Sequence, residues 1–172
     1  MLGETKVFWD GYGLGNPHGG ICQHAQMLLG PLKEVGIVPE VLRSSLSSEL
    51  RGFGVVKRPT QILPFFAFDS FLSPVRSYKE VVRQLEQGLF QKAILHGLSN
   101  CNLPLGFNQH HPKIKLVLTV HDVIPLLDRQ AVSVFHQLRV RAVMARVVAQ
   151  ADRIVCVSRW GAKTLIEKFP NI

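Results

Sequence analysis

The chain has 172 residues, 47% of them hydrophobic, and a formal net charge of +8 at pH 7. This length and hydrophobic content suit one domain with a buried core, and no apolar run approaches the ~20 residues that a membrane-spanning helix needs. The three scattered cysteines, Cys22, Cys101 and Cys156, argue against a disulfide framework or a cysteine metal site and favour a reducing, cytoplasmic setting. We expect no signal peptide, because the N-terminus leads straight into a predicted strand.

Short apolar runs alternate with helical periodicity, which is typical of a parallel α/β sheet. A strand is predicted at residues 6–10. The helix that follows has apolar residues at steps of three and four, and Gly36 suits its C-terminal end. Its predicted buried stripe consists of Ile21, Ala25, Leu28, Leu32 and Val35. Pro31 falls inside this helix, so we expect a kink or a split there.

The second strand is predicted at residues 37–42, and residues 43–60 resemble a loop with short structure. A third strand is expected near residues 61–63, ahead of an aromatic run that consists of Phe65, Phe66, Phe68 and Phe71. Ser77 and Glu80 have the spacing of a capping box, which predicts a helix from Ser77 to about Phe90. The apolar stripe of that helix is predicted to be Tyr78, Val81, Val82, Leu85 and Leu89.

Further strands are predicted at residues 92–96, 114–120 and 153–157. A long helix is expected over about residues 130–150, with Phe135, Leu138, Ala142, Met144 and Val148 among its apolar positions. Ser158 can cap a last helix at residues 159–169. The simplest arrangement of these elements is a Rossmann-like, doubly wound parallel sheet.

Polar residues follow three of the predicted strands directly. In an open α/β sheet the carboxyl ends of the strands form the edge where ligands bind. The candidate site residues at this edge are His96, Asn100, His121, Asp122, Ser158 and Arg159. Each histidine alone is more often a structural residue, but several such strand ends on one edge indicate a site.

The turn between the first strand and the first helix is rich in glycine and contains His18, Gly19 and Gly20. Glycine lets the backbone approach a ligand closely, and the N-terminus of the next helix favours a phosphate. The dinucleotide fingerprint is not met, because His18 stands at its third glycine position, and no P-loop motif occurs. Metal-ligand spacing, a nucleophile elbow and a glycosidase carboxylate pair are also missing from the sequence.

The last quarter of the chain is basic. Only Asp152 and Glu167 oppose the eight basic residues Arg129, Arg139, Arg141, Arg146, Arg153, Arg159, Lys163 and Lys168. Such a patch attracts nucleic acid, phosphorylated ligands or an anionic membrane, although an ordinary solvated face explains it equally well. No motif of the common RNA-binding modules is present, which argues against nucleic acid.

Five segments together resemble the N-terminal domain of the GT-B-fold, family 4 retaining glycosyltransferases. They span nearly the whole chain in the family's order. These segments are Gly19-Gly20-Ile21, His96-Gly97-Leu98, Leu103-Pro104-Leu105, the run from Leu118 to Leu126, and the run from Ala151 to Ser158.

The resemblance implies that residues 1–172 form a single acceptor-side domain and that a C-terminal domain, absent from this chain, holds most of the nucleotide-sugar donor. It places Gly19 and Gly20 against the donor diphosphate and gives His121 a catalytic contact with the transferred sugar. The other candidates would line the acceptor cleft: His18, His96, Asn100, Asp122, Ser158 and Arg159. It implies neither a cofactor nor a metal, and the nucleotide sugar is a substrate.

The implied activity is hexosyl transfer to a glycan or lipid-linked acceptor, as in polysaccharide or lipopolysaccharide synthesis. We expect a cytoplasmic protein that contacts the inner membrane face through Arg139, Arg146 and their neighbours, and we expect these 172 residues alone to be inactive. The alternative is a non-catalytic α/β module that binds a phosphorylated ligand or nucleic acid through its basic face. Donor, acceptor and oligomeric state are left open by the sequence.

Overall fold

A computed structural model describes residues 5–15, 19–43, 54–57, 66–105, 110–127 and 134–172. Its strands are β1 (Thr5–Asp10), β2 (Glu40–Arg43), β3 (Gly54–Lys57), β4 (Lys92–Gly97), β5 (Ile114–Val120) and β6 (Arg153–Cys156). All neighbouring strands pair in parallel, in the order β3-β2-β1-β4-β5-β6. This is the strand order of the Rossmann fold, so the predicted fold class is confirmed.

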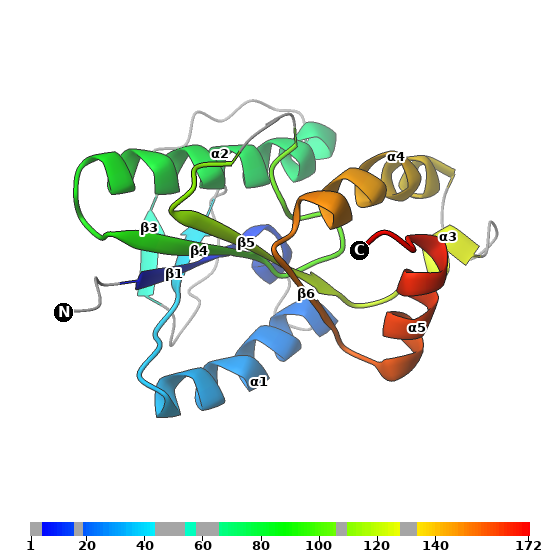
Figure 1. Ribbon diagram of the computed structural model, residues 1–172, viewed down its shortest axis with the longest axis horizontal. Coiled ribbons are helices and arrows are strands. Elements are labelled where there is room, and N and C mark those ends of the chain that lie inside the picture. The colour runs from blue at the N-terminus through cyan, green and yellow to red at the C-terminus, as the bar shows by residue number, and fades with distance from the viewer. Residues whose placement is uncertain (1–4, 16–18, 44–53, 58–65, 106–109, 128–133) are drawn as a thin grey trace.

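Helices cover both faces of the sheet. They are the 3-10 turn η1 (Tyr12–Gly15), α1 (Gly20–Glu34), α2 (Phe66–Glu86), the short α3 (Ile124–Leu127), α4 (Val134–Gln150) and α5 (Arg159–Lys168). Helices α2 and α4 lie on one face and α1 lies on the other (Figure 1). Helix α5 lies at the β6 end of the sheet, and its Leu165 joins the same buried cluster as α2 and α4. The sheet is therefore doubly wound, as predicted.

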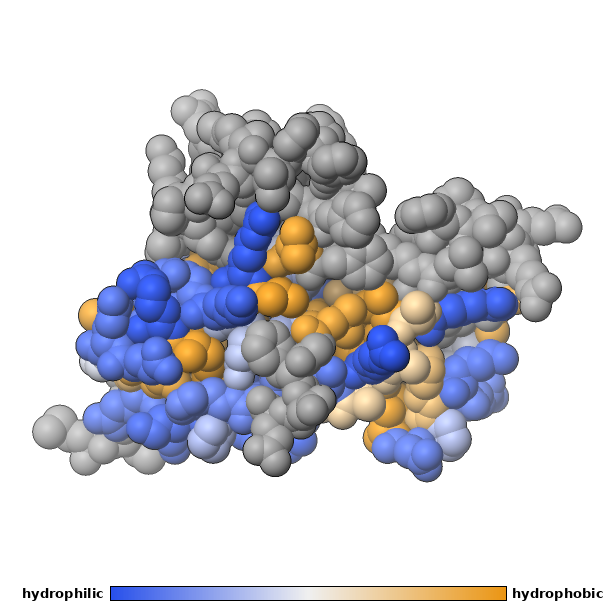
Figure 2. Space-filling view, turned by 90° about the horizontal axis from the view of Figure 1, so that it is seen from above, coloured by the Kyte–Doolittle hydropathy of each residue, from blue (hydrophilic) through white to orange (hydrophobic). Residues whose placement is uncertain are grey.

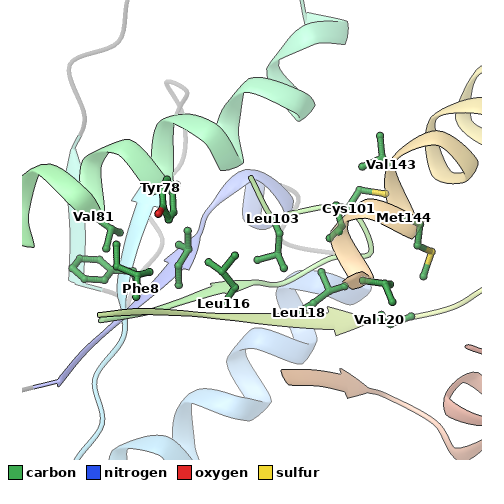
Figure 3. Packing of buried hydrophobic residues seen from close by; sticks show 14 of the residues in the cluster. Phe8, Tyr78, Val81, Cys101, Leu103, Leu116, Leu118, Val120, Val143 and Met144 are labelled. Carbon is green, nitrogen blue, oxygen red and sulfur yellow. The ribbon is translucent and has the colours of Figure 1, made fainter. Parts of the chain in front are cut away.

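The core has two parts because the sheet is covered twice. Successive side chains of β1 point to opposite faces, so Phe8 joins the larger cluster under α2 and α4, and Trp9 joins the smaller one under α1. Figure 3 shows the larger cluster, in which Leu116 and Leu118 of β5 face Val81 and Met144 of the covering helices.

Helix α1 buries Cys22, Ala25 and Leu29, with part of the predicted stripe flanking them half-buried. Val35 was predicted in the stripe but is 70% exposed. The expected split at Pro31 does not occur, since the helix continues to Glu34. Pro31 stands in the last turn of this helix.

Gly36 ends this helix as predicted. It has a φ of +76° and donates its N–H to the Lys33 carbonyl at 3.0 Å, while Ile37 donates to the Leu32 carbonyl at 2.8 Å. These two bonds form a Schellman motif. The chain then turns through Pro39 into β2, which begins three residues later than expected.

The segment between β2 and β4 differs most from the prediction. Strand β3 lies within the predicted loop, and the strand expected near residues 61–63 falls outside the described residues, as does Phe65. Helix α2 begins at Phe66, so Ser77 is an interior helical residue and the capping box is wrong. The helix ends at Glu86, and Leu89 is 59% exposed instead of belonging to a buried stripe.

The second half of the chain follows the prediction closely. Strand β5 has the predicted bounds, and β4 and β6 differ from theirs by one residue. Ser158 caps α5 by accepting the Gly161 N–H at 3.0 Å. Helix α3 was not predicted, and Ala142 of α4 is exposed although it was placed among the apolar positions. Residues 128–133 lie outside the described part.

Candidate functional site

The candidate site lies at the carboxyl ends of β1, β4 and β5. Strands β1 and β4 are neighbours although they are not consecutive in the sequence, so the strand order reverses between them. Ligands of open α/β sheets bind outside such a switch point. The loops that meet there are η1 after β1, residues 98–103 after β4 and residues 121–123 after β5.

His121 is half-buried and is fixed through both its backbone and its ring. Its backbone N–H donates to Asn100 Oδ1 at 2.8 Å, and Asn100 Nδ2 donates to the Asp122 carbonyl at 2.8 Å. The ring atom Nε2 lies 2.9 Å from the Leu98 carbonyl oxygen. A carbonyl oxygen only accepts, so Nε2 carries the proton in this contact, and Nδ1 of the neutral ring is an acceptor.

His24 of α1 is a site residue that the sequence analysis missed. Its ring meets that of His121 edge to face, with 5.3 Å between ring centroids. Burial, and secondarily the charge of His121, lowers the pKa of His24. The available signal was its place four residues after Gly20, which puts it one turn into the helix that opens at the glycine-rich loop.

His96 ends β4 beneath the site, and only 7% of it is exposed. Its Nε2 lies 2.7 Å from Thr119 Oγ1, and the Trp9 ring stands edge-on to it. Burial, and secondarily the charge of His24, lowers the pKa of His96 to about 4. His96 is therefore neutral near pH 7 and supports β5 from below the edge.

The N-terminus of α1 is formed by Gly19 and Gly20. Gly19 precedes the helix in an extended conformation and gives no side-chain cap to the first N–H groups. Gly20 is exposed, and a Cβ built on it would meet nothing within 4 Å. The first N–H groups of a helix are donors at the positive end of its dipole. His18 lies outside the described residues.

The remaining predicted residues differ in whether their polar side-chain atoms already bond to the protein. Asp122 Oδ1 accepts the Ile124 N–H at 3.1 Å and so supports the start of α3. The Ser158 hydroxyl is used as the cap of α5. Arg159 is exposed at the start of α5, beside the end of β6. The structure thus brings His121, Asn100 and Asp122 together, with His96 below them.

Asp10, a second residue that was missed, connects the loops of this edge. It is fully buried at the end of β1 and accepts the Tyr12 N–H at 3.0 Å. The hydroxyls of Ser73 and Ser77 on α2 also donate to its carboxylate, and Asn102 Nδ2 lies 3.4 Å from Oδ1. Asp10 ends an apolar strand just as His121 follows one, so the sequence pattern that pointed to His121 could also have pointed to Asp10.

The loop after β4 packs too tightly for a side chain at Gly97. A Cβ there would lie 2.2 Å from the Asn102 carbonyl oxygen. Because only glycine permits this approach, the loop can fold back at once and carry Leu98 and Asn100 towards His121.

Basic side chains gather at the β6 end of the molecule. Exposed members on α4, β6 and α5 are Arg141, Arg146, Arg153, Arg159, Lys163 and Lys168. Nothing is described of Arg129 or of the Arg139 side chain. Nearby, Asp152 forms a salt bridge with Lys115, with 2.6 Å between Oδ1 and Nζ. Figure 2 looks down on the face with α2 and α4, where hydrophilic residues flank exposed hydrophobic ones.

Two kinds of feature are absent from the described part of the chain. Its His, Cys, Asp and Glu side chains form no group of three or more that could hold a metal ion. None of its helices is long and apolar enough to cross a membrane.

Comparison with known families gives a match over most of the chain. The family model for Glycosyltransferase Family 4 matches residues 18–171, which includes the α1 N-terminus, the loop after β4 and His121. No curated protein matches the chain.

Proposed function

This chain belongs to glycosyltransferase family 4, and we propose that it is the acceptor-side domain of a retaining glycosyltransferase. The reaction would move a hexosyl group from a nucleotide sugar to a glycan or lipid-linked acceptor. One observation carries the proposal: the fixed ring of His121 stands at the switch-point edge and meets His24 of α1, the helix whose N-terminus is uncapped.

The N-terminus of α1 suits the donor diphosphate. When the sugar leaves, negative charge develops on the nucleoside diphosphate, and preorganised N–H donors stabilise such charge. Gly19 offers no side-chain oxygen to these donors, and the space beside Gly20 is open. Both features support binding of the phosphates by the backbone at this point.

His121 suits contact with the transferred sugar. Its Nε2–H is engaged by Leu98, and in that tautomer Nδ1 can accept a hydrogen bond from a sugar hydroxyl. Such a bond would orient the sugar while its anomeric carbon gains oxocarbenium character. In this proposal His121 is a catalytic residue through that contact, and the reaction uses no cofactor or metal.

A second domain completes the site in this proposal. By the family resemblance it would face the carboxyl edge of the sheet and supply most donor contacts, which leaves the acceptor to the loops described above. We further propose that the acceptor lies at an anionic membrane on its cytoplasmic face. The exposed arginines of α4 and β6 support this, because anionic lipids attract clustered basic side chains.

The test is transfer activity of His121→Ala in a polypeptide that joins this chain to its donor-binding domain, after a screen of nucleotide-sugar donors. We expect kcat/KM to fall about a hundredfold or more, the usual scale for one lost transition-state contact. His111→Ala is the matched control, since His111 precedes β5 at the opposite edge of the sheet. Circular dichroism should show both variants folded.

Full activity in His121→Ala would remove this residue from the mechanism. If no donor is turned over, but nucleoside diphosphate binds at the α1 N-terminus, the chain is instead a non-catalytic module for phosphorylated ligands.

A further inference from the structure

The loop after β4 supplies a side chain to the part of the chain beyond β5 that β4 no longer pairs with. The parallel pairing of β4 with β5 ends at Gly97 and Leu118. Three residues farther along, the backbone of His121 and Asp122 has left that ladder. Its N–H and carbonyl groups are met by the amide of Asn100, at 2.8 Å each.

The chemistry of this contact calls for a side-chain amide. One partner is an N–H donor and the other a carbonyl acceptor, so an amide with one oxygen and one NH2 group satisfies both at once. Aspartate would oppose a carboxylate oxygen to the Asp122 carbonyl, and alanine would leave both backbone groups without these bonds. The two partners also fix which way the amide points.

The same loop holds the His121 ring. Leu98, two residues before Asn100, accepts the proton of Nε2 at 2.9 Å. His24 packs edge-on against the ring from α1. Asn100 therefore holds the backbone of His121, and Leu98 holds its ring. Together they give the ring one orientation and one tautomer.

The loop itself has a firm base. Asn102 donates its N–H to the Ser99 carbonyl at 3.0 Å, its own carbonyl packs against Gly97, and its amide reaches buried Asp10. The position of Asn100 is thus set by contacts that do not involve His121.

We propose that Asn100 is a positioning residue that fixes the His121 backbone, and through it the ring orientation and tautomer, for sugar transfer. This inference rests on the proposed function, and it changes the part given to Asn100. Its amide oxygen and one of its N–H groups bond to the protein backbone, so we assign it to His121 and not to the acceptor.

Two variants test the proposal. Asn100→Ala removes both bonds, and Asn100→Asp keeps the shape of the side chain but loses the donor towards Asp122. Asn171→Ala is the matched control, because Asn171 is exposed near the C-terminus. Thermal denaturation identifies any variant that fails to fold.

The first measurement is made on the 172-residue chain. Long-range 1H–15N spectra of the imidazoles should show His121 as a single Nε2–H tautomer in the parent and in Asn171→Ala. Both Asn100 variants should show exchange between tautomers. An unchanged His121 signal in both variants would overturn the proposal, whether or not any sugar is transferred.

The second measurement is steady-state transfer in the two-domain polypeptide. We expect kcat to fall about ten- to a hundredfold in both variants, the scale of a misplaced group, with KM within about twofold because Asn100 touches no substrate. An altered ring with unchanged kcat would also overturn the proposal. A parent without transfer counts against the proposed function instead, and the imidazole spectra still decide whether Asn100 fixes the ring.

Discussion

At the residue scale, the polar side chains of the sheet edge divide into those that face solvent and those that face inward. His121 is half-buried and His96 is buried, although each stands at or just beyond the carboxyl end of a strand. Strand periodicity predicts where a run ends but not which way its last side chain points. Asn100 likewise looked like a ligand-binding residue in the sequence, yet its partners lie on another loop.

The buried His96 predicts a dependence of stability on pH. Its pKa is about 4 when folded and about 6.5 when unfolded. Below pH 6.5 the His96 ring is therefore protonated in the unfolded chain but stays neutral in the folded chain. Stability is then lost as pH falls from about 6.5 to about 4, by about 3 kcal/mol for this group. Urea unfolding of the parent and of His96→Gln at pH 7.5 and 4.5 measures this change in the unfolding free energy.

His96→Gln should lose less of its unfolding free energy over this interval than the parent does, because glutamine does not titrate. The amide also keeps a partner for Thr119, so the variant should fold. Equal losses in the two proteins would show that His96 does not stay neutral in the fold.

At the element scale, strands and caps were predictable where local sequence alone decides them. Strand β5 is a mostly apolar run, and Ser158 caps α5 directly after β6, so both were found. Helix α2 was misjudged because Ser77 and Glu80 have the spacing of a capping box, which marks a helix start. In the structure Ser77 is held inside the helix by Asp10, which is 67 residues away, and no local pattern reports that bond.

The contact between α2 and Asp10 predicts a specific loss of stability. Ser73 and Ser77 lie one helical turn apart, are fully buried, and both donate to the Asp10 carboxylate. Hydrogen bonds to charged groups contribute about 1.5–3 kcal/mol, so Ser77→Ala should lower the unfolding free energy by that amount. Urea denaturation measures the change.

The control for Ser77→Ala is Lys79→Ala, on the exposed side of the same helix, which should change stability by less than about 0.5 kcal/mol. A double-mutant cycle with Ser73→Ala should show coupling, because both hydroxyls share one carboxylate. Simple additivity of the two losses would contradict a shared network.

At the scale of the whole molecule, topology explains both the success and the gaps of the sequence analysis. Parallel order and the carboxyl-edge rule together predicted that His121 and its neighbours meet at one edge. They gave no sign of His24, because its role depends on how α1 packs against the sheet. The basic residues, predicted as one patch, lie on α4, β6 and α5, which Figure 1 shows together at one end of the molecule.

This distribution of charge predicts binding to anionic membranes through the β6 end. Co-sedimentation with phosphatidylglycerol-containing vesicles should exceed that with neutral vesicles at low salt, and should weaken as salt screens the charges. The double variant Arg146→Gln, Arg153→Gln should bind less, since each basic side chain near the surface contributes about 1 kcal/mol. The control Lys33→Gln, Lys79→Gln removes equal charge from exposed sites on α1 and α2. If both double variants lose equal binding, net charge alone attracts the chain; if the parent sediments equally with neutral vesicles, the membrane proposal fails.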